Sequence, residues 1–200
     1  NMSKVYRWGI VGAGGIAHKF ADALSYVENA ELAAVASTNM QRGRDFAEKH
    51  SVSDCYDSYE ELFASDAVDI VYVATTHNFH CKNVLGALGA KKHVLCEKQI
   101  GMNAQEADTL IEAAGKNPEL KVMEALMYRF HPQWKKTLDL VQNGSIGKVT
   151  NIHSFFSYHN VDQNTIRCSH VGTFSVNVVN DLFVSWYLIS GWYVISNMYC

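Results

Sequence analysis

Several features that mark particular protein classes are scarce or missing in this sequence of 200 residues. Its 17 Lys and Arg are balanced by 20 Asp and Glu and form no basic stripe, which argues against nucleic acid as the main partner. Its five cysteines are scattered and include no Cys-x-x-Cys pair, so we expect reduced thiols in a cytoplasmic protein. The first residues lack the apolar run of a secretory signal, so no such signal is expected.

Motifs for metal binding and for hydrolysis are missing as well. Five candidate metal ligands lie between residues 77 and 96, namely His77, His80, Cys81, His93 and Cys96. They lack the tight spacing of a metal site, so no metal is predicted. No Gly-x-Ser-x-Gly elbow occurs, so hydrolase chemistry has no support.

Charged residues are absent from residues 182–199, near the end of the chain. This stretch is close to the minimum length of a membrane span. Its serines and one asparagine interrupt the apolar run, and no Lys or Arg flanks it. These features favour a buried helix over a span, so we do not expect a membrane partner.

What is present is a regular alternation of apolar strands and amphipathic helices. Hydrophobic residues make up 48% of the chain, enough for a sizeable core. The expected strands are residues 5–11, 31–37, 68–74, 93–96 and 120–125, with helices between them and capping boxes at Ser58 and Asn103. The pattern predicts an α/β fold, a Rossmann doubly wound parallel sheet over residues 1–125. Residues 126–200 are expected to begin an incomplete α+β second domain.

A glycine-rich turn joins the first strand to the first helix. Residues 12–17 read Gly-x-Gly-x-x-Ala, with Gly12, Gly14, Gly15 and Ile16 in the turn and the helix start. Gly12 permits the tight turn, Gly14 lets a pyrophosphate approach the backbone, and the helix N-terminus attracts phosphate. We therefore predict a dinucleotide site, the alternative being a plain Gly-rich turn.

The end of the second strand should separate NAD from NADP. An Asp or Glu there would bind the ribose 2′-hydroxyl of NAD, but this chain has Ser37 and Thr38, with Arg42 nearby. Hydroxyl groups and a guanidinium suit a 2′-phosphate, so NADP is predicted over NAD. The alternative is that Ser37 or Thr38 only caps the next helix.

An adjacent acid and base, Glu97 and Lys98, end the strand at residues 93–96. Alone they would be an ordinary surface pair. Ligands of doubly wound sheets bind beyond the carboxyl ends of the strands, where Gly12, Ser37 and Thr75 are also expected. This convergence makes Glu97 and Lys98 candidates for the functional site.

With these motifs the chain resembles the glucose–fructose oxidoreductase/inositol dehydrogenase (Gfo/Idh/MocA) family. The matching runs include Val-Leu-Cys-Glu-Lys and Met-Tyr-Arg-Phe-His-Pro and lie at residues 7–14, 73–80, 94–98, 123–133 and 146–149. They follow one another in the family's order and span about residues 5–167. The nearest branches look like dihydrodiol dehydrogenases, glucose–fructose oxidoreductases and NADP-linked sugar dehydrogenases.

The resemblance implies roles for individual residues. Lys98 would be the catalytic lysine, whose ammonium stabilises negative charge on the reacting oxygen as hydride moves. Glu97 would lie against the cofactor. Thr75, His77 and His80 would line the pyrophosphate and ribose, with capping or packing as the alternative for the two histidines.

Two further positions, Arg129 and Phe156, match residues near the nicotinamide and the substrate pocket. The implied substrate is a small molecule, a sugar-like or cyclic alcohol or carbonyl compound. Self-association into a homo-oligomer is left open by the sequence.

The chain departs from the family pattern in two places. The family usually has proline after the lysine, whereas this chain has Gln99, which frees φ and adds an N–H. After about residue 167 the chain diverges and lacks the family's Asp and His or Tyr for proton transfer. We therefore expect a truncated or alternatively ended form of such an enzyme. Two functions therefore stay open: an NADP-dependent oxidoreductase, or a catalytically silent dinucleotide-binding protein.

Overall fold

The computed structural model describes residues 4–155 and 173–177. The chain divides into two compact units, Asn1–Leu126 and Met127–Cys200.

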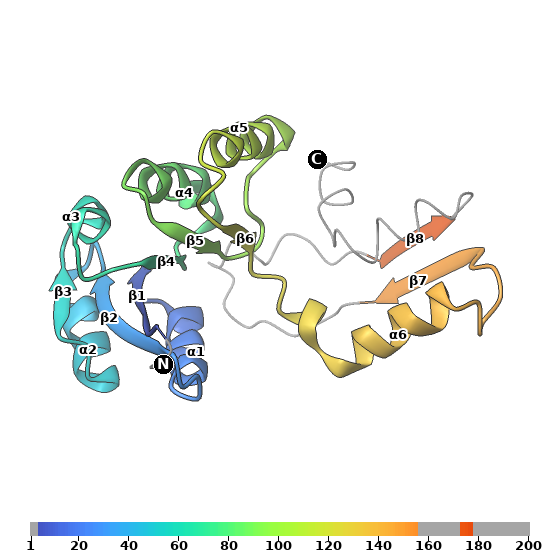
Figure 1. Cartoon of the computed structure of the whole chain (residues 1–200), viewed down its shortest axis with the longest axis horizontal. Helices are drawn as coiled ribbons and strands as arrows, with labels where there is room; N and C mark the ends of the chain where they lie inside the picture. The colour runs from blue at the N-terminus through green and yellow to red at the C-terminus, as the bar shows by residue number, and fades with distance from the viewer. Residues whose placement is uncertain (1–3, 156–172, 178–200) are drawn as a thin grey trace. The chain divides into compact units, whose positions relative to one another are not determined.

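The first unit is built on one parallel sheet (Figure 1). Its strands are β1 (Tyr6–Val11), β2 (Ala30–Ala36), β3 (Asp54–Tyr56), β4 (Ile70–Val73), β5 (His93–Cys96) and β6 (Val122–Glu124). All neighbouring strands pair in parallel, in the order β3-β2-β1-β4-β5-β6. This is the doubly wound order, and it confirms the predicted Rossmann fold. The three-residue strand β3 was not predicted, because it is too short to show a period.

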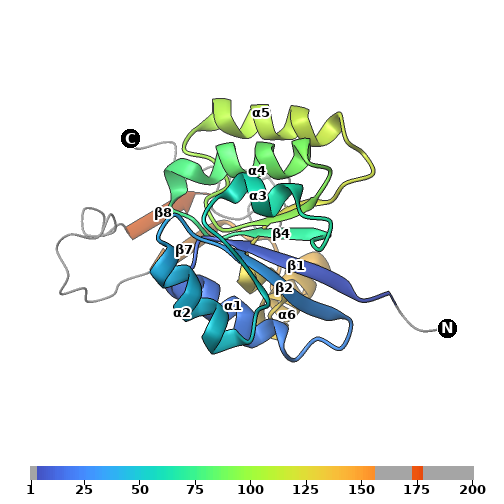
Figure 2. The same ribbon diagram turned by 90° about the vertical axis from the view of Figure 1, so that its left-hand side faces the viewer.

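Helices cover both faces of this sheet. They are α1 (Gly15–Leu24), α2 (Met40–His50), α3 (Tyr59–Ala64), α4 (His80–Gly89) and α5 (Ala104–Gly115), with the 3₁₀ turn η1 (His77–Phe79) before α4. Figure 2 shows α1 and α2 on one face and α3, α4 and α5 on the other. The predicted caps are present, since Ser58 accepts from the N–H of Glu61 and Asn103 from that of Glu106.

The strand period of two divides the core between these faces. In β4, Val71 and Val73 join the cluster that contains Leu62 of α3 and Val84 of α4. Tyr72, between them, joins the cluster that contains Ala17 and Phe46, on the α1 and α2 side. Successive side chains of a strand point to opposite faces, so a sheet covered on both sides needs an unbroken apolar run.

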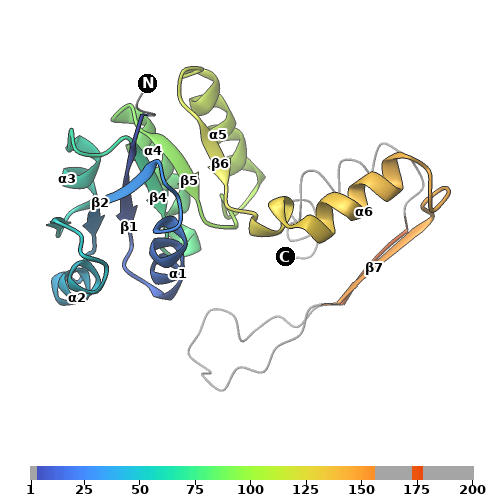
Figure 3. The ribbon, with the colours of Figure 1, turned by 60° about the horizontal axis from the view of Figure 1, so that its bottom comes forward.

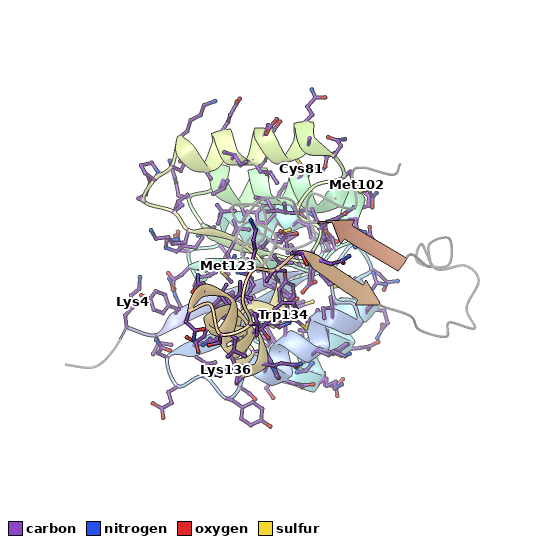
Figure 4. The ribbon with its side chains drawn as sticks, turned by 90° about the vertical axis from the view of Figure 1, so that its right-hand side faces the viewer. Lys4, Cys81, Met102, Met123, Trp134 and Lys136 are labelled. Atoms are coloured by element: carbon purple, nitrogen blue, oxygen red, sulfur yellow. The ribbon has the colours of Figure 1, made fainter. Side chains whose placement is uncertain are left out.

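The second unit contains η2 (Met127–Phe130), α6 (Pro132–Gln142), β7 (Asn151–Phe155) and β8 (Thr173–Asn177), and β7 pairs antiparallel with β8. Helix α6 starts at Pro132, and the His131 side chain accepts from the N–H of Gln133. Trp134, labelled in Figure 4, lies 5.1 Å from the Tyr128 ring. No helix among the described residues has the length and apolar character to cross a membrane, and the tail at residues 182–199 lies outside them.

Candidate functional site

The first part of the site is the glycine turn after β1, which Figure 3 shows running into α1. Gly12 has φ +94°, and a Cβ there would lie 2.9 Å from the carbonyl oxygen of Ala74. Its N–H donates to the carbonyl oxygen of Ala36, 2.9 Å away. Only glycine adopts this conformation so close to a neighbouring backbone. Gly12 therefore fixes the turn after β1 against the ends of the two neighbouring strands, β2 and β4.

The next two glycines face open space instead. A Cβ on Gly14 or Gly15 would meet no heavy atom within 4 Å. Helix α1 has no side-chain cap and no acidic residue in its first turn, so no side chain of its N-cap or first turn satisfies its first N–H groups. Ile16 is half-buried against the α1-side core and Ala17 is fully buried. An uncapped helix N-terminus above open space fits a pyrophosphate.

At the end of β2 the polar side chains divide into buried and exposed. Ser37 is fully buried, and its hydroxyl accepts from the N–H of Asn39, 3.2 Å away. Asn39 caps α2 by accepting from the N–H of Arg42, 3.0 Å away. Thr38 and Arg42 are exposed, and α2 has no acidic residue in its first turn. The Ser37 hydroxyl is therefore buried and accepts a hydrogen bond inside the protein, whereas Thr38 and Arg42 are accessible.

After β4, the residues predicted around Thr75 have different surroundings. The buried Asn83 side chain donates to the Thr75 hydroxyl, 3.2 Å away. His77 lies in η1, and its ring meets that of His80 edge to face at 5.5 Å. His80 is fully buried, with both ring nitrogens within hydrogen-bond distance of backbone carbonyl oxygens. This geometry favours the packing role for His80 over a direct contact with cofactor.

The end of β5 joins a buried acid to an exposed base. Glu97 is 8% exposed, and its Oε1 accepts from the Tyr72 hydroxyl at 2.6 Å. Burial and this hydrogen bond raise the pKa of Tyr72, so the phenol keeps its proton. Phe20 of α1 stacks on the Tyr72 ring at 3.9 Å. The Lys98 N–H donates to Glu97 Oε2 at 3.3 Å, so the carboxylate holds the backbone of Lys98.

The Lys98 side chain itself is exposed, and no carboxylate among residues 4–151 forms an ion pair with it. Its peptide bond to Gln99 is cis. The next N–H, that of Ile100, donates to Glu124 Oε1 at 3.1 Å. Burial raises the pKa of Glu124, against the opposing effect of this hydrogen bond and of nearby positive charge. The site thus presents an exposed Lys98 ammonium on a backbone held by the buried Glu97 and the half-buried Glu124.

Three polar residues of this arrangement were missed from the sequence: Tyr72, Asn83 and Glu124. Each lies in an apolar strand or helix, and the period of that element alone gives it no separate role. A polar residue inside an apolar run indicates a buried hydrogen bond, because buried polar groups need partners, and this signal could have identified the three residues.

The substrate-side predictions belong to the second unit. Arg129 is exposed in η2. Phe156 lies outside the described residues. Among the described residues no cluster of three or more His, Cys, Asp or Glu is arranged to hold a metal. Burial raises the pKa of the Cys96 thiol, which makes it a poor ligand or nucleophile.

A scan against known families matches residues 6–125 to the GFO_IDH_MocA model, described as an oxidoreductase family with an NAD-binding Rossmann fold. Among curated proteins, trans-1,2-dihydrobenzene-1,2-diol dehydrogenase from Danio rerio is 38% identical over 152 residues. That alignment covers 75% of this chain and 45% of the relative. The chain thus spans about half the length of the curated relatives it matches.

Solved structures give the same picture. Scyllo-inositol dehydrogenase from Lactobacillus casei, with bound NAD(H) and scyllo-inositol, superposes with a TM-score of 0.70 at 25% identity, covering 74% of this chain and 44% of that one. A mutant 3-ketoreductase from Actinomadura kijaniata, in complex with TDP-benzene and NADP, gives 0.69 at 30% identity, covering 76% and 48%. The family match, the doubly wound order and the uncapped glycine turn agree. The chain belongs to the Gfo/Idh/MocA family of oxidoreductases with an NAD-binding Rossmann fold.

Proposed function

We propose that this protein is an NADP-dependent oxidoreductase that moves a hydride between the nicotinamide and a sugar-like or cyclic alcohol or carbonyl compound. The observation that carries the proposal is the exposed Lys98 ammonium on a backbone held by Glu97, at the sheet edge where the glycine turn also opens. When bound, the nicotinamide supplies or accepts the hydride.

The chain's own residues have the following roles in this proposal. The N–H groups at the start of α1, beside Gly14 and Gly15, hold the pyrophosphate. Thr75 and His77, near the end of β4, lie along the pyrophosphate and ribose. The Lys98 ammonium stabilises negative charge on the reacting oxygen and relays its proton. Glu97 holds Lys98 in place by accepting a hydrogen bond from its backbone N–H. A direct contact of Glu97 with the cofactor is secondary to this role.

The preference for NADP rests on the end of β2. Thr38 and Arg42 are exposed there, and no acidic side chain lies in the first turn of α2. A 2′-phosphate would gain a guanidinium, a hydroxyl and a helix N-terminus, whereas NAD would lack the carboxylate that its ribose prefers. NAD is therefore the less favoured cofactor.

The chemistry of the relatives supports the proposed substrate class. One acts on trans-1,2-dihydrobenzene-1,2-diol, one binds scyllo-inositol, and one is a 3-ketoreductase. The first two compounds are cyclic alcohols. We place Arg129 and Phe156 on the substrate side, and homo-oligomer formation stays open. We also infer a cytoplasmic location, supported by the free thiols of Cys55, Cys81 and Cys96.

A catalytically silent dinucleotide-binding protein is the second candidate. Its support is the tail after residue 167, which lacks the family's proton-transfer pair, together with Gln99 after Lys98. This candidate keeps the glycine turn and the β2 end but performs no hydride transfer.

One experiment separates the two candidates. The chain is titrated with NADPH and with NADH, then assayed on sugars and cyclic diols beside Lys98→Ala and the control Lys116→Ala, an exposed lysine on α5's C-terminal side. The proposal predicts tighter binding of NADPH and turnover that falls at least about a hundredfold in Lys98→Ala only. Binding without turnover above Lys98→Ala supports the silent protein, and no dinucleotide binding contradicts both.

A further inference from the structure

His80, the first residue of α4, sits at the junction of two strand ends. It is fully buried. Its Nε2 lies 3.0 Å from the carbonyl oxygen of Thr75, at the end of β4. Its Nδ1 lies 2.7 Å from the carbonyl oxygen of Gln99, just beyond Lys98. One ring therefore bridges the loops that follow β4 and β5.

The chemistry of the two partners fixes the protons of this ring. A carbonyl oxygen can only accept a hydrogen bond, so each contact needs an N–H on the imidazole. A neutral imidazole has one N–H, and the lone pair of its other nitrogen would face a carbonyl oxygen at a residue with no exposed surface. An imidazolium has two N–H groups and satisfies both carbonyl oxygens, each bond strengthened by its charge.

We propose that His80 is a positioning residue that carries protons on both ring nitrogens and, as a buried imidazolium, ties the loop after β4 to the loop after Lys98. Lys98 then lies between two fixed points. Its own N–H is held by Glu97, and the carbonyl oxygen of Gln99 is held by His80. Because two adjacent backbone groups are fixed, the lysine is aimed without using its side chain.

The surroundings can support a buried positive charge. Glu124 of β6 is half-buried and close enough that His80 acts on its charge. Glu97 is buried at the end of β5. Cys81 follows His80 in α4, His77 is in ring contact with it from η1, and the exposed Lys98 precedes Gln99. A buried charge is costly unless it is paired and hydrogen-bonded, and His80 has two acceptors and a nearby acid.

Nitrogen NMR of the whole chain, labelled with ¹⁵N histidine, tests the protonation state without any cofactor or activity. At pH 7.5 both ring nitrogens of His80 should show the shifts of N–H nitrogens. His93 is a control in the same spectrum, because its Nδ1 accepts from the N–H of Lys121 at 3.0 Å and must carry no proton. A His80 ring with one unprotonated nitrogen at that pH overturns the proposal.

Variants test the positioning role. His80→Phe keeps a ring but removes both donors, while Asn83→Leu removes a different buried donor of the same helix, the one bound to the Thr75 hydroxyl. Relative to the core amide of Val35, amide exchange at Lys98 and Ile100 should rise at least about tenfold in His80→Phe and not in Asn83→Leu. His80→Gln, which retains amide N–H donors, should restore part of the protection.

Equal exchange in His80→Phe and Asn83→Leu, after correction to Val35, would show that His80 is merely part of the core. If His80→Phe does not fold, the wild-type spectrum and the exchange of His80→Gln decide the question. In His80→Gln, exchange at Lys98 and Ile100 identical to that of the wild type would contradict the proposal.

Discussion

The ends of β5 and β2 are both proposed to contact the dinucleotide, yet their side chains are arranged in opposite ways. At the β5 end, Lys98 is exposed but its backbone is fastened by the buried Glu97 and by its neighbours' bonds to His80 and Glu124. At the β2 end, Thr38 and Arg42 are exposed on a helix start that is capped by Asn39.

This difference separates two tasks. A group that stabilises charge on a reacting atom must be held accurately, and buried hydrogen bonds provide that accuracy. A group that chooses between cofactors needs only charge and access, which a surface arginine provides. We therefore expect substitutions around β5 to affect stability and chemistry, and substitutions around β2 to affect cofactor choice.

Gly12 lies between the two ends and should show the largest effect. Gly12→Ala adds a Cβ 2.9 Å from the Ala74 carbonyl oxygen at φ +94°, so we expect about 3 kcal/mol less free energy of unfolding. Gly14→Ala adds a Cβ in open space and should change stability by less than about 1 kcal/mol, while weakening NADPH binding. Urea unfolding and NADPH titration of both variants measure this. Equal stability of the two variants would show that the turn is not locked.

Tyr72→Phe tests whether the β5 end depends on its buried bond. The change keeps the stacking with Phe20 but removes the donor to Glu97, so we expect a loss of about 2 kcal/mol. Tyr56→Phe makes the same change at a half-buried hydroxyl 3.3 Å from Ser65 and should cost under about 1 kcal/mol. Chemical denaturation compares them. If Tyr56→Phe lowers the free energy of unfolding as much as Tyr72→Phe, the buried hydrogen bond to Glu97 has no special weight in stability.

The two halves of the sheet should also respond to pH with opposite signs. On the α1–α2 side, burial lowers the pKa of His50, helped by His18 at 2.8 Å and opposed by Asp22. The unfolded chain then binds more protons, so this contribution to stability falls as pH drops below about 7. At Glu124 the pKa is raised by burial, so its contribution falls as pH rises through the raised value.

Unfolding measured from pH 4 to pH 8 separates these contributions. His50→Phe should remove the part of the stability that increases with pH, and Phe46 at 4.6 Å offers a ring for it to pack against. Glu124→Gln should remove the part of the stability that decreases with pH, because an amide does not titrate. Its amide oxygen can still accept from the N–H of Ile100, so the hydrogen bond is kept. We expect both pH effects to be smaller than the effect of Tyr72→Phe. Unchanged pH slopes in the two variants would exclude these residues as the source.

Local sequence patterns predicted the strands and the glycine turn but did not predict hydrogen bonds between residues that are far apart in the chain. Apolar runs and glycine spacing gave the sheet and the turn, because period and conformational freedom are local properties. The bond from Tyr72 to Glu97 joins residues 25 apart, and no local pattern records it. Ser37 shows the same limit: its residue type suited a phosphate, but only the fold shows that its hydroxyl is buried against Asn39.

Arg42→Ala should have the smallest effect on stability and the most selective effect on binding. Its side chain is exposed, and the cap uses its backbone N–H, which alanine retains. We expect NADPH affinity to fall about tenfold with NADH affinity unchanged, because only the 2′-phosphate would lose a charged partner. Gln41→Ala, at the neighbouring exposed position, is the control. Fluorescence titration measures both cofactors, and an equal loss for NADPH and NADH would assign Arg42 to binding in general and remove the β2 end from cofactor choice.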